Sequence, residues 1–575
     1  MNLFVVAWAE RPIDAALPER ALSDVLGRLP FFPGRPVQGW ADESGRCAAA
    51  WVAHEGLDYV HAEPGRLALF AGRPILWTGD TRADGRAPLD PRFYLDHHFA
   101  TSELDGRFAA ARFADGKLEV TSDRLGAYPL YATEVGGVRL VSNNAEALRA
   151  ARGGSSMSAP VLASLLGGGW SLTGDPVWDG VHRIPPPALA TGVAQMLGAG
   201  FEPERAAANA AASVRALADW PGRPSVVPVT GGRDSRLVLG AALAAGIDFT
   251  TTTGGEPGQP DVEIGRRLAQ AAGVPHSVLE HDPHGSVMTD WRRAAELLSL
   301  TTSGTSSLSD AAGFPFGPRP GPLVLWHSGQ GGEVARAYYG LGERLDRDSL
   351  IERQYRAFVA RRPGRTEMIG SQGQRLVREQ IGQFVDEQLG AGVAPVDVPD
   401  MFYLQRRMGT WAGPSHGAVE FVRDTTSPLW SHRLLRDELG LPAGDRAREL
   451  FHLRVLERLA PQLVDIPFED DRPWPARQSD LARRVQRGRV LARKVRGEVL
   501  RRARAARAPS PPGEDPFARV LPEIRDAVLS QPGHDAWQVL DRARVEALLR
   551  SPAGALDTMS RYYAWRLATV FGPTA

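Results

Sequence analysis

The chain has 575 residues, 43% hydrophobic and 23% charged, and its 67 basic side chains balance 67 acidic ones. Its single cysteine, Cys47, excludes a disulfide framework, a cysteine-rich zinc site and an iron–sulfur cluster. Zero net charge argues against a general nucleic-acid binder, which normally has a basic excess. The length predicts about two or three domains.

The apolar opening, residues 3–9, is predicted to be a buried first strand rather than a signal peptide, because it is short and lacks a basic flank. No run approaches about 18 uninterrupted apolar residues, so we expect no membrane span. We expect a cytoplasmic protein, which also suits a single unpaired thiol.

Residues 1 to about 200 contain short β-like runs between Gly, Asp and Pro, a pattern typical of a strand-dominated domain. These runs are residues 66–70, 108–113, 118–121, 128–131 and 138–141. Beyond them the pattern becomes α/β, with predicted helices at 204–220, 235–245 and 261–272 and predicted strands at 225–230, 249–253, 276–279 and 323–327. This alternation predicts βαβ units around a parallel sheet.

Helical patterns dominate from about residue 345 onward. Residues 483–507 carry eleven basic side chains and one acidic one, and the Pro-rich stretch 508–513 that follows is predicted to be an exposed linker. The basic run is either a solvated helix face or a groove for an acidic or nucleotide-bearing ligand.

An apolar strand that runs into Gly231 and Gly232 and then into a helix is the most informative segment. Glycines let the backbone approach a ligand, and loop amides at a helix N-terminus attract an anion. Thr230 and Ser235 can donate hydroxyl hydrogen bonds to phosphate. Asp234 beside a phosphate would be repelled unless a divalent cation bridges them, so Asp234 is a candidate magnesium ligand. The alternative is a tight strand-to-helix turn in which Asp234 caps the helix.

A second strand also runs into a glycine-rich loop, which contains Gly329 and Gly331 and ends in Glu333. Two strand-end loops that each end in a carboxylate are what a magnesium–pyrophosphate clamp at the edge of a parallel sheet requires. Asp234 and Glu333 would hold the metal from opposite sides. The alternative for this loop alone is a glycine turn closed by a surface glutamate.

Together these motifs resemble the asparagine synthetase family. Residues 230–235 are similar to its Ser-Gly-Gly-x-Asp-Ser pyrophosphate loop, with Thr230 for Ser. Residues 329–333 are similar to its second motif, Gly-x-Gly-x-Asp, with Glu333 in the Asp position. The resemblance implies that the strand end carrying Thr252 and Gly254 flanks AMP.

The resemblance continues into the first part of the chain and covers roughly residues 60–340. The segments similar to the family's glutaminase half are 104–110, 123–131, 142–148 and 178–186. It implies an Ntn-type αββα glutaminase-like domain over residues 1–200. It also implies a PP-loop α/β domain with a parallel sheet, an ATP-pyrophosphatase domain, over residues 201–575, with a helical part from about 345.

The chain departs from the family at the glutaminase nucleophile. Family glutaminases use a cysteine directly after the initiator methionine. Asn2 occupies that position here, and Cys47 lies far inside the chain. We therefore expect no glutamine hydrolysis and a retained N-terminal scaffold, as the resemblance implies for the family's β-lactam synthetases and lasso-peptide cyclases.

The chain also departs from the family at a lysine that stabilises charge on the acyl-adenylate. Only Lys117 and Lys494 are present, so the candidates are Lys494, Arg472 and Arg477. Lys494 is alternatively one more cation on a basic helix. Arginine stabilises phosphate charge but cannot act as a base. Glu420, in a stretch loosely similar to the family's Glu-x-Arg-x-Pro segment, either orients the nucleophile or pairs with a neighbouring arginine.

The resemblance implies an AMP-forming carbon–nitrogen ligase that uses ATP and Mg²⁺. A substrate carboxylate would be adenylated and then coupled to an amine, for example within a precursor peptide that closes into a lasso-type macrolactam in natural-product biosynthesis. One alternative is ammonia-using amidation of a small metabolite or glycan. The other is a nucleotide-binding scaffold without turnover.

Overall fold

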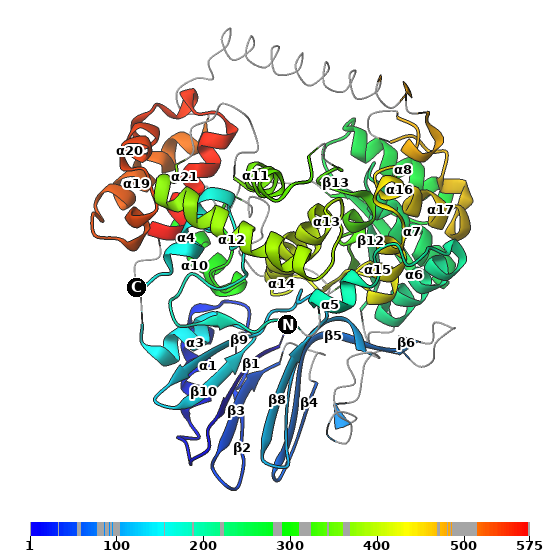
Figure 1. Ribbon diagram of the computed structural model, residues 1–575. Helices are drawn as coiled ribbons and strands as arrows, with labels where there is room; N and C mark the ends of the chain where they lie inside the picture. Colours follow the sequence, from blue (N-terminus) through cyan, green and yellow to red (C-terminus); the bar gives the residue numbers. More distant parts are fainter. Residues whose placement is uncertain are drawn as a thin grey trace.

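The fold is mixed α/β, with two antiparallel sheets, one five-stranded parallel sheet and many helices (Figure 1). The computed structural model describes residues 2–32, 34–53, 59–77, 85–86, 91–92, 95, 104–154, 156–186, 189–218, 223–279, 290–309, 324–341, 344–359, 368–468, 472–479, 481–482, 485 and 515–572. Within these residues, every helix falls short of the length and hydropathy that a membrane crossing requires.

The two antiparallel sheets lie in the first part of the chain. The six-stranded sheet runs β11 (His182–Arg183), β9 (Tyr131–Val135), β10 (Val138–Ser142), β1 (Leu3–Trp8), β3 (Cys47–Val52), β2 (Gln38–Ala41). The other contains β4 (Val60–Glu63), β5 (Arg66–Trp77), β7 (Leu104–Ala114) and β8 (Lys117–Ser122), with β6 (Gly85–Arg86) paired to β5. Apolar side chains of both sheets share one core, and α1 (Leu17–Arg28) and α3 (Ala145–Arg152) pack against the first sheet.

The parallel sheet forms the centre of the second part. Its order is β14 (His276–Leu279), β13 (Phe249–Gly254), β12 (Ser225–Pro228), β15 (Leu325–His327), β16 (Thr425–Thr426). Helices α6 (Pro203–Ala218), α7 (Arg233–Ala245) and α8 (Pro260–Ala272) accompany it. The chain moves from β12 to one side through β13 and β14, then crosses to the other side at β15. The gap between β12 and β15 is therefore a topological switch point, where ligands bind in open α/β sheets.

Helices make up most of the rest of the chain, as expected from residue 345 onward. They are α4 (Ala159–Gly168), α5 (Leu189–Ala194), α10 (Trp291–Thr302), η1 (Gly332–Arg336), α11 (Arg347–Phe358), α12 (Ser371–Gly390), α13 (Val398–Phe402), the π-helix η2 (Tyr403–Ala412), α14 (Gly413–Val419), α15 (His432–Gly440), α16 (Ala443–Arg446), α17 (Leu450–Leu459), η3 (Pro461–Leu463), η4 (Pro475–Arg477), α19 (Pro516–Leu529), η5 (Asp535–Gln538), α20 (Arg542–Arg550), η6 (Ala553–Ala555) and α21 (Thr558–Phe571). One core joins α4, α10, α11 and α12 to α19, α20 and α21 (Figure 1).

Most predicted elements are confirmed, with one clear error. Residues 128–131 are not a strand: β9 begins only at Tyr131. The preceding segment is a turn in which the buried Asp123 carboxylate accepts hydrogen bonds from the backbone N–H groups of Leu125, Ala127 and Tyr128. The basic run 483–507, apart from Val485, and the Pro-rich stretch after it lie outside the described residues.

Candidate functional site

The two glycine-rich loops predicted from the sequence touch each other at the switch point. A side chain at Gly329 would place its Cβ 2.8 Å from the backbone nitrogen of Ser235, and one at Gly332 would lie 2.5 Å from Asp234 Oδ1. Only glycine fits at these positions, because the loop after β15 packs directly on the first turn of α7. The structure therefore brings both predicted loops into one site.

The first loop is organised by its own hydroxyl groups. Thr230 Oγ1 lies 3.1 Å from Ser235 Oγ and accepts a 3.1 Å hydrogen bond from the backbone N–H of Gly232. The backbone N–H of Gly231 donates to Asp261 Oδ1 at 2.7 Å, so this amide already holds a carboxylate oxygen. No side chain caps α7 at Gly232. An uncapped helix N-terminus beside donor groups favours an anionic ligand.

Asp234 does not cap the helix that it begins. Its Oδ1 lies 2.8 Å from His452 Nε2, and its Oδ2 accepts a 2.9 Å hydrogen bond from Arg336 Nη2. The same Arg336 nitrogen lies 3.5 Å from Glu333 Oε1, while Glu333 Oε2 accepts from the backbone N–H of Gly331 at 3.2 Å. One guanidinium thus links the two carboxylates that the sequence singled out.

The electrostatics of this cluster differ between the two acids. Burial by itself would raise the pKa of Asp234, but the hydrogen bond to His452 and the charge of Arg336 lower it below its ordinary value. Burial and the charge of Asp234 raise the pKa of Glu333. Burial, and then the charges of Asp234 and other nearby acids, also raise the pKa of Glu438, whose Oε1 is buried without a hydrogen-bond partner in the described residues. The raised pKa values favour the neutral forms of Glu333 and Glu438, and a cation bound beside them would favour the ionised forms.

Two of these carboxylates could hold a magnesium ion. Asp234 and Glu333 offer oxygen ligands, which Mg²⁺ prefers. In the described part of the chain, no three or more His, Cys, Asp or Glu side chains gather in a way that could hold a metal by themselves. Two protein carboxylates suit Mg²⁺ in nucleotide sites, since its other positions are usually filled by phosphate oxygens and water.

The end of β13 lies beside the end of β12, which leads into the loop that contains Gly231 and Gly232. Thr252 is buried, and its hydroxyl has no hydrogen-bond partner among the described residues. Gly254 is exposed and pairs in register with Leu279 at the end of β14, whose side chain is 41% exposed. An exposed leucine at the edge of the sheet offers an apolar contact to a ligand.

Glu420, Arg472 and Arg477 contact residues other than Asp234 and Glu333. Glu420 forms a buried ion pair with Arg107 of β7, which places it between the N-terminal sheets and the helices rather than beside Asp234. Arg472 lies over the ring of Phe468, at 5.5 Å from its centroid. Arg477 is exposed and pairs with acidic surface residues. Lys494 lies outside the described residues.

Sequence reasoning missed Arg336 and His452. Arg336 follows Glu333 by three residues, so a helical turn over η1 would have placed the two side chains on one face. His452 has no comparable signal, because it is 218 residues from Asp234 and reaches it only through the packing of α17 on α7.

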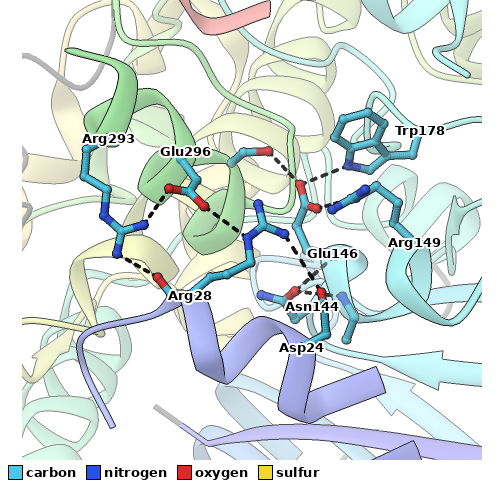
Figure 2. Close-up of polar contacts among 10 residues, drawn as sticks. Asp24, Arg28, Asn144, Glu146, Arg149, Trp178, Arg293 and Glu296 are labelled. Carbon is cyan, nitrogen blue, oxygen red and sulfur yellow. Dashed lines mark hydrogen bonds and ion pairs between the residues drawn. The ribbon is translucent and has the colours of Figure 1, made fainter. Parts of the chain in front are cut away.

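A large cleft lies elsewhere in the described part of the chain. A cleft of about 1340 Å³ opens between α1, α3, the start of α10 and the turn after α19. Figure 2 shows that its charged side chains pair with one another: Arg28 with Glu296 at 3.0 Å, and Arg149 with Glu146 at 2.8 Å. Trp178 Nε1 also donates to Glu146 at 3.0 Å. These contacts brace the helices against each other and lie apart from the loops.

Asn2 and Cys47 are also buried. Asn2 Nδ2 donates to the Phe70 carbonyl at 3.2 Å, and the Asn2 carbonyl accepts from Asn143 at 2.7 Å. Cys47 is fully buried at the start of β3, where burial raises the pKa of its thiol to about 12. A thiol of this kind stays protonated and unreactive at neutral pH.

Comparisons with known proteins add no further assignment. No protein-family model matches the chain, and no curated protein matches it.

Proposed function

We propose that the chain is an ATP-dependent, AMP-forming carbon–nitrogen ligase of the asparagine synthetase type. The observation that carries the proposal is the contact between two glycine-rich loops at a sheet switch point, with Asp234 and Glu333 linked by Arg336. Glycine-rich strand ends, a helix N-terminus and paired carboxylates are together the elements of a magnesium–pyrophosphate site. The PP-loop assignment of residues 201–575 belongs to this proposal.

Different residues along the sheet edge would bind the base, the phosphates and the metal ion of MgATP. Gly254 and Leu279 offer the surface for the base, and Thr252 can contribute its unpartnered hydroxyl. Thr230 and Ser235 bring hydroxyl donors to the phosphates. Asp234 and Glu333 would hold Mg²⁺, which neutralises phosphate charge when bound.

The proposed reaction has two transfers. An oxygen of the substrate carboxylate attacks the α-phosphorus of ATP, the bond from that phosphorus to the bridging oxygen breaks, and pyrophosphate leaves. An amine nitrogen then attacks the acyl carbon, the acyl–oxygen bond to AMP breaks, and the amine releases a proton. Positioning of the reactants and neutralisation of phosphate charge supply most of the rate enhancement in chemistry of this kind.

The amine does not come from glutamine in this proposal. Two sheets that share a core, with α1 and α3 on one outer face, support an Ntn-type domain over residues 1–200. However, Asn2 lacks a nucleophilic side chain and the thiol of Cys47 is buried. The amine then comes either from a free amine or, as we favour, from the acyl substrate itself, as in a precursor peptide closed into a macrolactam, which would give the chain a role in natural-product biosynthesis.

Product analysis tests this function. The purified chain is supplied with ATP, Mg²⁺ and a panel of carboxylates that carry or lack an internal amine, and the nucleotide products are separated. We expect AMP and pyrophosphate in equal amounts, dependent on the carboxylate. ADP formation contradicts adenylation. Product formation only with added ammonia favours amidation of a metabolite or glycan, and ATP binding without turnover favours a scaffold.

A further inference from the structure

Arg336 contacts the acidic side chains of both loops. Its Nη2 lies 2.9 Å from Asp234 and 3.5 Å from Glu333, and its side chain is 18% exposed. Its Nε is buried and has no hydrogen-bond partner among the described residues, so the guanidinium has unused donor capacity. The other arginine at this turn, Arg233, pairs instead with Glu449 at 2.7 Å.

The oxygens that Arg336 contacts are those expected to hold Mg²⁺. A guanidinium and a divalent cation repel each other and compete for the same carboxylate lone pairs. Metal coordination by Asp234 and Glu333 therefore weakens the attraction that holds Arg336 in its present position. Because η1 begins in the loop itself, a displaced Arg336 side chain stays at the site and needs a new anionic partner.

We propose that Arg336 exchanges partners. In the free protein it bridges Asp234 and Glu333, and when Mg²⁺ and ATP are bound its guanidinium N–H groups donate hydrogen bonds to the pyrophosphate oxygens. The planar fork of arginine matches two phosphate oxygens at once. Arg336 then takes the charge-stabilising role for which the sequence offered Lys494, Arg472 and Arg477. This inference rests on the proposed function.

Two opposite shifts in binding test the exchange. The full chain and its Arg336→Gln variant are titrated by calorimetry with Mg²⁺ alone and with magnesium pyrophosphate. Removing the competing guanidinium should tighten binding of Mg²⁺ alone by about threefold or more. Losing the hydrogen bonds from the charged guanidinium to two phosphate oxygens should weaken binding of magnesium pyrophosphate by about ten- to hundredfold.

Two further variants serve as controls. Arg336→Lys keeps the charge without the fork, so it should weaken pyrophosphate binding less than Arg336→Gln does, and it provides the test if the glutamine variant unfolds. Arg347→Gln removes an exposed arginine that pairs with Asp386, and should change neither affinity.

The possible outcomes distinguish a failure of the partner exchange from a failure of the proposed function. Opposite shifts in Arg336→Gln support the exchange. A loss of both affinities indicates a purely structural role and overturns it, as does unchanged pyrophosphate binding. If the unaltered chain binds neither magnesium pyrophosphate nor MgATP, the proposed function itself fails.

Discussion

Asp234 of α7 contacts residues of two other elements of the fold. It lies in the first turn of α7, contacts His452 of α17 and Arg336 of η1, and packs against Gly332. Its side chain is only 15% exposed, so its charge acts in a medium less polar than water. Such a carboxylate suits the capture of a cation that arrives with a phosphate ligand.

Replacing Asp234 by Asn tests this role. Asn keeps the size of the side chain but removes the charge, so AMP formation should fall by roughly a hundredfold or more. The melting temperature should stay close to that of the unaltered chain. Asp248→Asn, at an exposed position of the same domain, is the matched control and should keep full activity. Undiminished AMP formation in Asp234→Asn would show that the metal site lies elsewhere.

At the residue scale, local patterns predicted the acids but not their partners. Asp234 and Glu333 stand out because each follows glycines at a strand end, which is a pattern readable within about six residues. His452 and Glu438 come from helices far along the chain, and only tertiary packing brings them to the loops. Glu420 was a plausible candidate on local pattern, yet its partner, Arg107, is 313 residues away.

At the element scale, His327 joins three strands of the parallel sheet. Its Nε2 lies 3.0 Å from Ser225 Oγ of β12 and its Nδ1 lies 3.1 Å from Thr426 Oγ1 of β16. The side chain is fully buried, and burial, with the charge of Arg73, lowers the pKa of His327 to about 3. The ring therefore stays neutral in the folded protein at pH values where an unfolded histidine takes up a proton.

This difference predicts acid sensitivity. Between about pH 6.5 and pH 3 only the unfolded state protonates this histidine, so the free energy of unfolding should fall as the pH falls, by about 1.4 kcal/mol per pH unit from His327 alone. Urea denaturation at pH 7, 6 and 5 measures it. His327→Gln should flatten the dependence, whereas His182→Gln, at an exposed position, should not. Equal slopes in all three proteins would refute the assignment.

The alternation of strands and helices was predictable, but the shortest elements were not. Apolar runs between glycines and prolines indicated β12, β13 and β14 and the helices beside them. β16 has two residues, Thr425 and Thr426, and no apolar run, because it exists only through its pairing with β15. The π-helix η2 carries a helical pattern in sequence, and its wider winding is not encoded in that periodicity.

At the scale of the whole molecule, buried ion pairs join the N-terminal antiparallel sheets to the part of the chain that contains the parallel sheet. Arg107 pairs with Glu420, and Arg73 lies 3.0 Å from Asp424. Asp105 accepts from the backbone N–H of His432 at 3.0 Å. The cavity among these contacts measures about 10 Å³, room for about one water. Because the charged partners are so far apart in sequence, these contacts could not be inferred from composition.

In the proposed reaction, a substrate carboxylate attacks the α-phosphorus of ATP. An acid that supports turnover is prepared with ¹⁸O in both carboxylate oxygens, and the products are examined by mass spectrometry. Adenylation followed by amide formation leaves one substrate oxygen on the phosphate of AMP, so the account predicts AMP heavier by one ¹⁸O and unlabelled pyrophosphate. Unlabelled AMP, or label in released phosphate or pyrophosphate, would contradict it.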